Sequence, residues 1–437
     1  MRVMRLVAVV LACGLAEGGI LAPTPDDPNQ FAGLGGYLRY AERHNAGVRA
    51  AYQKYIAAAE MIPQAKALPD PMFEFEMDTR VDTEDQTFAL RQTFPWFGVT
   101  EARGAAASAE AKAALREYEA ARLALFNRVK RAFYEYAYLG QAVAIARQNL
   151  ELLLHFEEVA RVRYATSAGG HPDVIRAQIE MAMLQEKVRE LETMRGPVTA
   201  ELNAAMNRPS ESALPWPRSQ EYAPRAFSRA ELVARLTARN PELKAMEAMV
   251  EAAQRRAELA RKRFYPEFGL GVEWMRTDGM TPSMMGGSGE DPIVAMFSVT
   301  IPLWQDSYSA GERQARAQAR EARERRVELE NELASRAAQA LYEYEDSARK
   351  AVLYRDTLIP KGKEMLEVAE GAYRAGTADF LTLLDAQRTL LQFEVEYRRA
   401  VADNFQALAE IEMLAGGENG GGTEAALAGG AVAKDRP

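Results

Sequence analysis

The sequence predicts a mainly α-helical protein with a small β part, built from two copies of one structural plan. Three observations predict this fold class. Short stretches of the first half recur in the second half in the same order, brief segments alternate between apolar and polar residues, and long Ala-, Glu- and Arg-rich runs contain almost no proline. Alternation with a period of two indicates strands, whereas long Ala-rich runs without proline indicate helices.

The chain begins with a segment typical of a secretory signal. Arg2 and Arg5 precede a short apolar run from Leu6 to Ala12, which is too short to span a bilayer as a helix. The run ends at Cys13, the one cysteine of the sequence, so no intramolecular disulfide is expected. Two interpretations of Cys13 remain open. It is a small residue within the signal, or it is the lipidated first residue of a bacterial lipoprotein, since "VLAC" is similar to a lipobox.

Self-comparison indicates a tandem duplication. "NAGVRA" at 45–50 corresponds to "NPELKA" at 240–245, and "PMFEFEM" at 71–77 corresponds to "PEFGLGV" at 266–272, with the same offset in both cases. The predicted organisation is a signal segment at 1–22, a first repeat at 23–207, a Pro-rich linker at 208–227, a second repeat at 228–415 and a disordered Gly-rich tail at 416–437.

Each copy is expected to begin with one helix, at roughly 37–66 and at 228–264. In the second copy Ser228 is a candidate N-cap, because Glu231 follows three residues later as in a capping box.

Two short strands follow in each copy. In the first copy Phe73, Phe75 and Met77 alternate with acidic residues, and the returning strand covers 86–94. The second copy repeats this arrangement, with strands around 268–274 and 293–301. Strict alternation predicts that each strand has one apolar face.

A very long helix is predicted after each pair of strands. Residues 99–165 contain no proline, and a helix of that length would extend about 100 Å. Residues 308–374 match them, but Pro360 is expected to kink or break the second helix. Each long helix leads through a Gly-containing loop into a final helix of about 35 residues. In the last of these, an apolar spacing near 3.5 fits coiled-coil packing against the preceding helix.

Four strands with an apolar face cannot close a barrel within one chain. Their predicted length of about nine residues suits a tilted strand that crosses a bilayer. Three chains that each contribute four strands would form a barrel of 12, an even number as bacterial barrels have. The alternative is a small soluble sheet that packs on the protein's own helices.

Prolines mark each exchange between strand and helix, because proline fixes φ and is tolerated at strand ends. Aromatic residues gather at the same positions, either as an aromatic belt at a membrane interface or as plugs of the sheet–helix junction. The candidate junction residues are Pro69, Pro71, Pro95, Trp96, Pro266, Pro302 and Trp304.

Several stretches resemble the TolC-like outer-membrane efflux proteins of Gram-negative bacteria. They are "NPELKAMEAMVEAAQRRAELARKRFYPEFGLGV" from Asn240, "IPLWQDSYSAGERQARAQA" from Ile301 and "YRAGTADFLTLLDAQRTLLQFEVEYRRAVADNFQALAEIEMLAG" from Tyr373. The resemblance covers nearly the whole chain outside the signal and the tail. "LRQTFPWFG" from Leu90 is similar to the branch that serves heavy-metal-type tripartite pumps.

The resemblance implies a homotrimer with a 12-stranded barrel in the outer membrane and an α-helical tunnel in the periplasm. It implies contact with outer-membrane lipid, a periplasmic adaptor and an inner-membrane pump. The hairpin tips would dock the adaptor through Tyr164, Gly169, Gly170, Tyr373, Arg374, Gly376 and Thr377. Asp173 and Asp379 are the candidate residues of the closed aperture, although an Asp at a helix start is also an ordinary N-cap.

Other classes of function lack support in the sequence. The net charge is −8 and the arginines are spread along helices, so nucleic acid is not expected as a partner. The three histidines lack metal-ligand spacing, and no catalytic or phosphate-binding motif is present, so neither an enzyme nor a cofactor is expected. The methionines at 275–292 suit Cu(I) chemically, but a surface loop is the preferred interpretation. The main alternative to an exit duct is a periplasmic coiled-coil scaffold without a pore.

Overall fold

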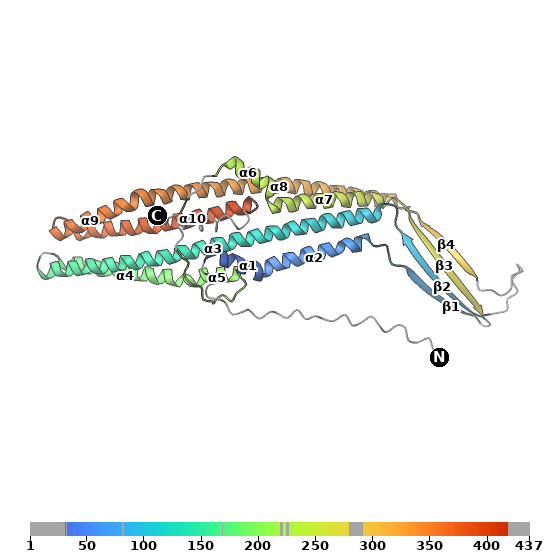
Figure 1. Cartoon of the computed structure of the whole chain (residues 1–437), viewed down its shortest axis with the longest axis horizontal. Coiled ribbons are helices and arrows are strands. Elements are labelled where there is room, and N and C mark those ends of the chain that lie inside the picture. The colour runs from blue at the N-terminus through green and yellow to red at the C-terminus, as the bar shows by residue number, and fades with distance from the viewer. Residues whose placement is uncertain are drawn as a thin grey trace, which may run out of the picture.

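The computed structural model describes residues 31, 33–80, 83–167, 169–218, 222–223, 227–278 and 292–417. The signal segment with Cys13, most of the methionine-containing loop and nearly all of the tail lie outside the described residues. The described part is elongated: helices run along most of its length, a sheet lies at one end, and two helical hairpin tips lie at the other (Figure 1).

Four strands form one antiparallel sheet, in which neighbours in sequence are neighbours in space. β2 pairs with β3, so the two copies are joined edge to edge through their sheets. The alternating segments predicted these strands, and the structure confirms them as β1 (Met72–Arg80), β2 (Thr83–Phe94), β3 (Glu267–Asp278) and β4 (Ile293–Thr300).

The central helix is α3 (Val99–Ala165), a single helix of 67 residues, as the proline-free run predicted. Gly98 precedes it with φ +76°, a left-handed conformation that favours glycine. At the other end the Thr166 hydroxyl donates to the carbonyl oxygens of Val162 and Arg163, each at 3.1 Å. The helix contacts both copies of the repeat, since α2, α4, α7 and α10 all pack on it.

The interruption predicted at Pro360 is confirmed. The second long helix consists of α8 (Gln305–Leu353), a π-helical turn η2 (Tyr354–Leu358) and α9 (Ile359–Ala375). Proline has no N–H to donate, and its ring clashes with the carbonyl four residues earlier, so the preceding turn widens.

The prediction of one opening helix in each copy is wrong. The first copy has α1 (Leu34–His44) and α2 (Ala46–Lys66), and the second has α6 (Arg229–Arg239) and α7 (Pro241–Lys262). Asn45 and Asn240 break the two helices with ψ near 121° and 123°, and their side chains cap α2 and α7.

The expected cap at Ser228 is absent as well. Ser228 lies at the N-cap position of α6 without a capping hydrogen bond, and Glu231 pairs with Arg235.

The final helix is continuous in only one copy. α10 (Phe380–Leu414) has 35 residues, as predicted, whereas the corresponding segment divides into α4 (His171–Thr193) and α5 (Arg195–Ala205) around Met194. Pro197 explains the division, because it removes a backbone donor from the turn that would continue α4. α10 packs on α9 as expected, and it also packs on α8 and α3.

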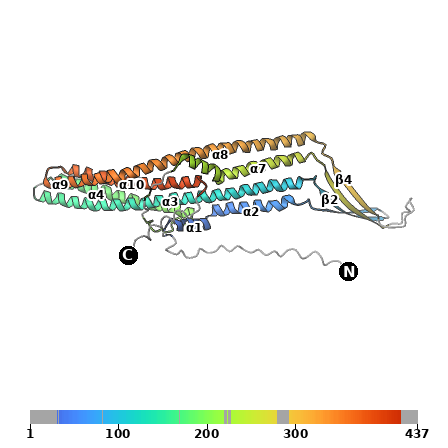
Figure 2. The same ribbon diagram turned by 45° about the horizontal axis from the view of Figure 1, so that its top comes forward.

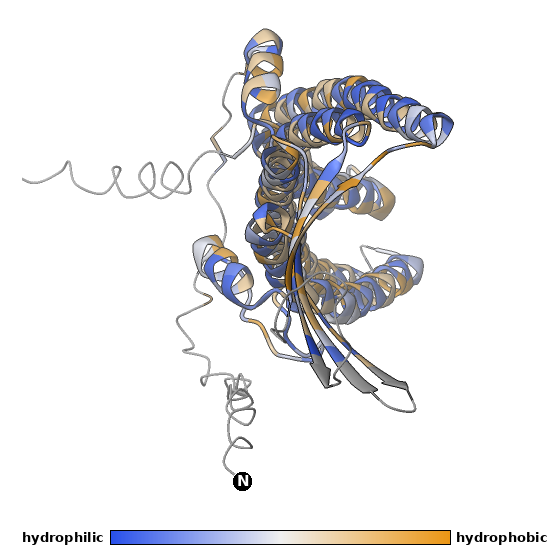
Figure 3. Ribbon diagram, turned by 90° about the vertical axis from the view of Figure 1, so that its right-hand side faces the viewer, coloured by the Kyte–Doolittle hydropathy of each residue, from blue (hydrophilic) through white to orange (hydrophobic). Residues whose placement is uncertain are grey.

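The helices form a wall rather than a closed bundle. Towards the sheet, α2, α3, α7 and α8 lie side by side, each in contact with the next (Figure 2). Alanines such as Ala113 and Ala252 are buried between these helices, so their backbones approach closely. Towards the tips, α4, α3, α10 and α9 enclose a core of larger side chains that includes Phe156, Leu384 and Phe380. Figure 3 looks along the long axis and shows the helices in an open arc.

The segment between the two copies crosses the outside of this wall. Trp216 stacks on Tyr136 at 4.8 Å, and the Arg195 guanidinium lies 4.5 Å from the Trp216 ring. A Cβ atom at Gly140 would lie 2.8 Å from the Trp216 ring, so this close approach requires glycine. None of the helices in the described part of the chain is both long and apolar enough to cross a membrane.

Candidate functional sites at the two ends of the helices

The two predicted hairpin tips lie side by side at the end of the molecule that is farthest from the sheet (Figure 1). One is the α3–α4 loop, in which the Gly169 N–H donates to the Arg163 carbonyl at 3.1 Å and Gly170 precedes α4. The other is the α9–α10 loop, in which Gly376 has φ +77° and the Thr377 N–H donates to the Ala372 carbonyl at 2.9 Å.

Tyr373 joins the two tips. Its side chain is 2% exposed, and the Arg163 guanidinium of α3 lies 4.5 Å from its ring. Its hydroxyl donates to Asp173 of α4 at 3.4 Å. Burial first, and then the Asp173 carboxylate, raise the pKa of Tyr373 to about 12. Tyr373 therefore acts inside the tip, where it fixes one hairpin against the other.

The remaining predicted tip residues are more accessible. The Tyr164 side chain is half-exposed, and its ring lies 5.1 Å from the ring of His171. Arg374 donates to His155 of α3 at 2.9 Å and also pairs with Glu370, so it is a second contact between the hairpins.

The two predicted aperture residues have different environments. The Asp379 carboxylate accepts from the Thr382 N–H at 2.9 Å and from the Thr382 hydroxyl at 2.6 Å, which caps α10. These bonds, the one from the hydroxyl above all, lower the pKa of Asp379. Asp173 lies in the first turn of α4, between the Tyr373 hydroxyl and Arg176.

The predicted junction residues lie where strands meet helices. Pro71 and Pro266 directly precede β1 and β3, Pro95 directly follows β2, and Pro302 follows β4 after one intervening residue. The Pro69 and Pro302 carbonyls accept from the side chains of Gln92 and Gln305, each at 2.8 Å.

Trp96 and Trp304 lie at the same end of the helices, but their surroundings differ. Trp96 stacks flat on Tyr265, with ring centres 5.2 Å apart and planes 9° apart. Trp304 occupies the N-cap position of α8, and its side chain is 77% exposed. Both tryptophans therefore lie where a strand changes into a long helix, and Trp304 presents its ring to the surroundings.

The sheet has one apolar face that is open to the surroundings. Phe75, Phe88, Trp274 and Ile293 lie in register across all four strands. Phe73, Phe297 and Ile293 are each at least 66% exposed. The opposite face carries Glu74, Glu273 and Arg91, and Glu74 pairs with Arg91 at 3.0 Å. A broad exposed apolar band of this kind is unusual in water and suits contact with lipid.

Comparison with known proteins finds similarity to one family in the second half of the chain. A family profile described as "Outer membrane efflux protein" matches residues 232–417, from α6 to just beyond the end of α10. Residues 232–417, a little less than half of the chain, are thus similar to outer membrane efflux proteins.

Similar proteins align with most of the chain. The cobalt-zinc-cadmium resistance protein CzcC of Cupriavidus metallidurans is 24% identical over 410 residues, which are 90% of this chain and 92% of CzcC. The pyoverdine export outer membrane protein OpmQ of Pseudomonas putida is 24% identical over 340 residues, which are 74% of this chain and 68% of OpmQ.

Solved channels share the fold. The outer-membrane channel OprN has a TM-score of 0.76 at 20% identity and covers 89% of this chain and 92% of its own. CusC has a TM-score of 0.76 at 15% identity and covers 91% of this chain and 96% of its own. VceC of Vibrio cholerae has a TM-score of 0.70 at 18% identity and covers 90% of this chain and 99% of its own.

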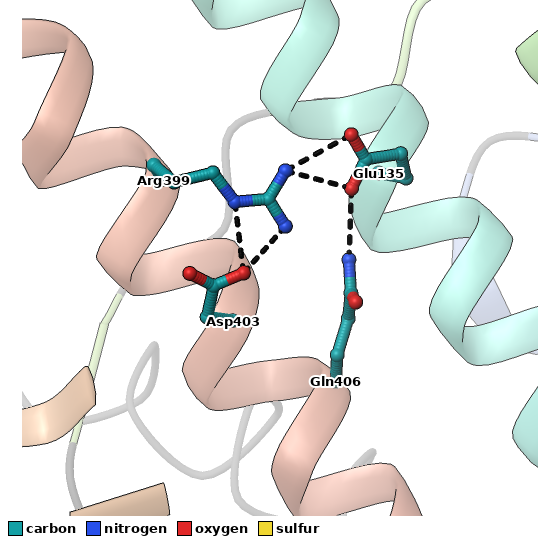
Figure 4. Close-up of polar contacts among 4 residues, drawn as sticks. All are labelled: Glu135, Arg399, Asp403 and Gln406. Atoms are coloured by element: carbon teal, nitrogen blue, oxygen red, sulfur yellow. Dashed lines mark hydrogen bonds and ion pairs between the residues drawn. The ribbon is translucent and has the colours of Figure 1, made fainter. Parts of the chain in front are cut away.

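Sequence reasoning missed two features of the structure. The Asn45 and Asn240 amides donate to the carbonyls of Ala205 and Leu414 at 2.8 and 3.1 Å, so each asparagine also caps the helix that ends beside it. The recurrence of Asn before "AGVRA" and "PELKA" was the available signal. The second feature is a polar cluster between α3 and α10 (Figure 4), which no local sequence pattern marks.

Proposed function

We propose that three copies of this chain assemble into one exit duct, with twelve strands in a shared outer-membrane barrel and the helices in a periplasmic tunnel. The observation that carries the proposal is the open four-stranded sheet. Its apolar face is exposed, and its outer strands β1 and β4 each have only one partner in the described part of the chain. Unpaired strand edges cannot lie in lipid, so further strands must close the sheet.

The duct is proposed to be passive and to depend on partners. An inner-membrane pump supplies the energy, and a periplasmic adaptor joins the pump to the tips at Tyr164, Gly169, Gly170, Tyr373, Arg374, Gly376 and Thr377. Asp173 and Asp379 are proposed to line the closed aperture at the same end. No group of His, Cys, Asp or Glu among the described residues is arranged to hold a metal ion.

The assembly is tested by purification of the full chain from outer membranes. We expect a trimer by mass photometry and discrete conductance steps in planar bilayers. A monomer that fractionates with soluble periplasmic proteins would exclude the duct. A trimer without conductance would favour a coiled-coil scaffold.

The substrate is proposed to belong to the heavy-metal class. The relative named for cobalt, zinc and cadmium resistance aligns over 92% of its own length. Deletion of the gene should therefore lower the concentrations of Co²⁺, Zn²⁺ or Cd²⁺ that the cells tolerate. Unchanged metal tolerance together with loss of siderophore export would favour the class named for OpmQ.

Cys13 is proposed to anchor the amino terminus through a lipid, on the strength of the lipobox-like "VLAC". Metabolic labelling with palmitate should mark the wild-type chain and leave Cys13→Ser unmarked. Equal labelling of the two chains would refute the anchor.

A further inference from the structure

The wall near the sheet has two uncovered edges, one along α2 and one along α8. In the described part of the chain, α2 packs on α3, and the first half of α8 packs on α7. The sides of α2 and α8 that face away from these neighbours are exposed. α2 and α8 are thus the two outermost helices of the row α2, α3, α7 and α8 in Figure 2.

Both edges have the small residues that the inner seams of the wall use. Exposed alanines recur every seven residues on α2, at Ala50 and Ala57, and on α8, at Ala310 and Ala317. A spacing of seven keeps residues on one side of a helix that packs against another. Within the wall, the corresponding alanines are buried between neighbouring helices. The exposed sides of α2 and α8 therefore resemble the buried contacts between helices of the wall, but no helix covers them in the described part of the chain.

Each edge also carries charged side chains that form no hydrogen bond or ion pair within the described residues. They include Arg49 and Glu60 on α2, and Arg320 and Glu328 on α8, and all four of these residues are exposed. Neighbouring charges are paired inside the chain, as Lys54 is with Glu117 and Arg325 is with Glu321. Arg49, Glu60, Arg320 and Glu328 can therefore pair with side chains of a second copy.

Contacts across the wall define which residues lie at the same height. Lys54 of α2 pairs with Glu117 of α3, and Glu110 of α3 pairs with Arg256 of α7. α7 is related to α8 by two further pairs, Arg261–Glu312 and Glu247–Arg326. With these pairs as reference points, the rise per residue gives each side chain a position along the long axis. Glu60 and Arg320 then lie at the same position to within about one turn, and so do Arg49 and Glu328.

We propose that α2 of one copy packs antiparallel against α8 of a second copy, with ion pairs Glu60–Arg320 and Arg49–Glu328 across the seam. In this orientation opposite charges meet at both heights, whereas a parallel orientation would place Arg49 near Arg320 and Glu60 near Glu328. The proposal rests on the trimeric duct proposed above and assigns the residues that join its subunits. Because the tunnel is formed by copies side by side, this seam closes its wall.

Disulfide cross-linking of the full chain tests the seam. The variant Glu60→Cys/Arg320→Cys should give a covalent trimer on non-reducing gels after mild oxidation, and each single variant should not. The matched control is Glu60→Cys/Arg313→Cys. Arg313 is also exposed on α8 but lies two turns, about 10 Å, from Arg320, so this pair should cross-link at least fivefold less.

Charge reversal gives an independent measurement. Glu60→Arg and Arg320→Glu should each lower the temperature at which the trimer dissociates on gels, and the double variant Glu60→Arg/Arg320→Glu should restore most of the loss. A trimer that forms normally but does not cross-link at positions 60 and 320, or shows no rescue in the double variant, overturns this seam and leaves the duct intact. A wild-type chain that stays monomeric overturns the duct itself, and the seam with it.

Discussion

At the residue scale, the protein depends on a few side chains that each join two elements. Asn45 and Asn240 accept from the start of one helix and donate to the end of another. Tyr373 is held between Arg163 and Asp173, which belong to the other hairpin. Such residues contribute more than an average hydrogen bond, because their removal leaves buried backbone groups without partners.

Asn240→Ala is expected to lower the free energy of unfolding by about 1–3 kcal/mol, since it removes a cap and leaves the Leu414 carbonyl unpaired. Thermal unfolding followed by circular dichroism measures the effect. Asn331→Ala is the control, because Asn331 is an exposed residue in the middle of α8. Equal melting temperatures for the two variants would show that Asn240 has no special role.

The raised pKa of Tyr373 predicts that the free energy of unfolding falls at alkaline pH. Its pKa is about 12 in the folded state and 10 in its unperturbed state. The protonated hydroxyl therefore stabilises the fold fully below about pH 10, and this contribution disappears as the pH rises towards 12. Between these limits the stability of wild type should fall more steeply than that of Tyr373→Phe. Tyr164→Phe, which alters an exposed ring at the same tip, should follow wild type. Parallel pH profiles for all three proteins would argue against this account.

At the element scale, the long helices are held together by polar contacts that cross from one hairpin to the other. Figure 4 shows Arg399 of α10 with Glu135 of α3, and Asp403 and Gln406 beside them. Arg399 donates to both oxygens of Glu135, at 2.9 and 2.8 Å, and Gln406 donates to Glu135 at 3.0 Å. The Arg399 guanidinium also lies 4.6 Å from the ring of Tyr138.

A double-mutant cycle with Arg399→Met and Glu135→Gln should give a coupling energy of about 1 kcal/mol, near the upper end for partly exposed pairs, because Asp403 holds the other two nitrogens of the Arg399 guanidinium in place. Urea unfolding of the four proteins supplies the energies. The control is the pair Arg189–Glu186 on α4, in which both side chains are more than 70% exposed. Its coupling energy should be less than about 0.3 kcal/mol. If both cycles give the same value, the cluster adds no specific link between the hairpins.

At the scale of the whole molecule, the surface of the helices suits water, whereas one face of the sheet suits lipid. The helical wall carries a polar surface and alanine seams, whereas the sheet exposes aromatic and aliphatic side chains on one face and charges on the other. Neighbouring residues of a strand alternate between these faces. The proposed outer-membrane location of the sheet agrees with this division.

The two faces of β3 predict opposite responses to the same substitution. Val272→Arg places a charge on the apolar face and should cost about 2–4 kcal/mol in the membrane, so the amount of assembled protein should drop sharply. Glu273→Arg alters the adjacent residue on the charged face and should assemble almost normally. Western blots of outer-membrane fractions measure both. Comparable losses for the two variants would contradict the assignment of the faces.

The sequence by itself determined the elements whose causes are local. Residues 99–165 form one helix because they contain no proline, Pro360 interrupts the second long helix, and alternation of apolar residues with polar residues or glycine marks β1 and β3. Tertiary structure decided what depends on distant partners. Asn45 and Asn240 divide the opening helices because each meets a helix end that is more than 150 residues away along the chain. Likewise, Tyr373 is a buried contact between the tips, and Glu135 meets Arg399, because the fold brings the two repeats together. A local sequence pattern predicts the secondary structure of its own segment. Contacts between side chains that are far apart in the sequence form only when the helices pack against one another.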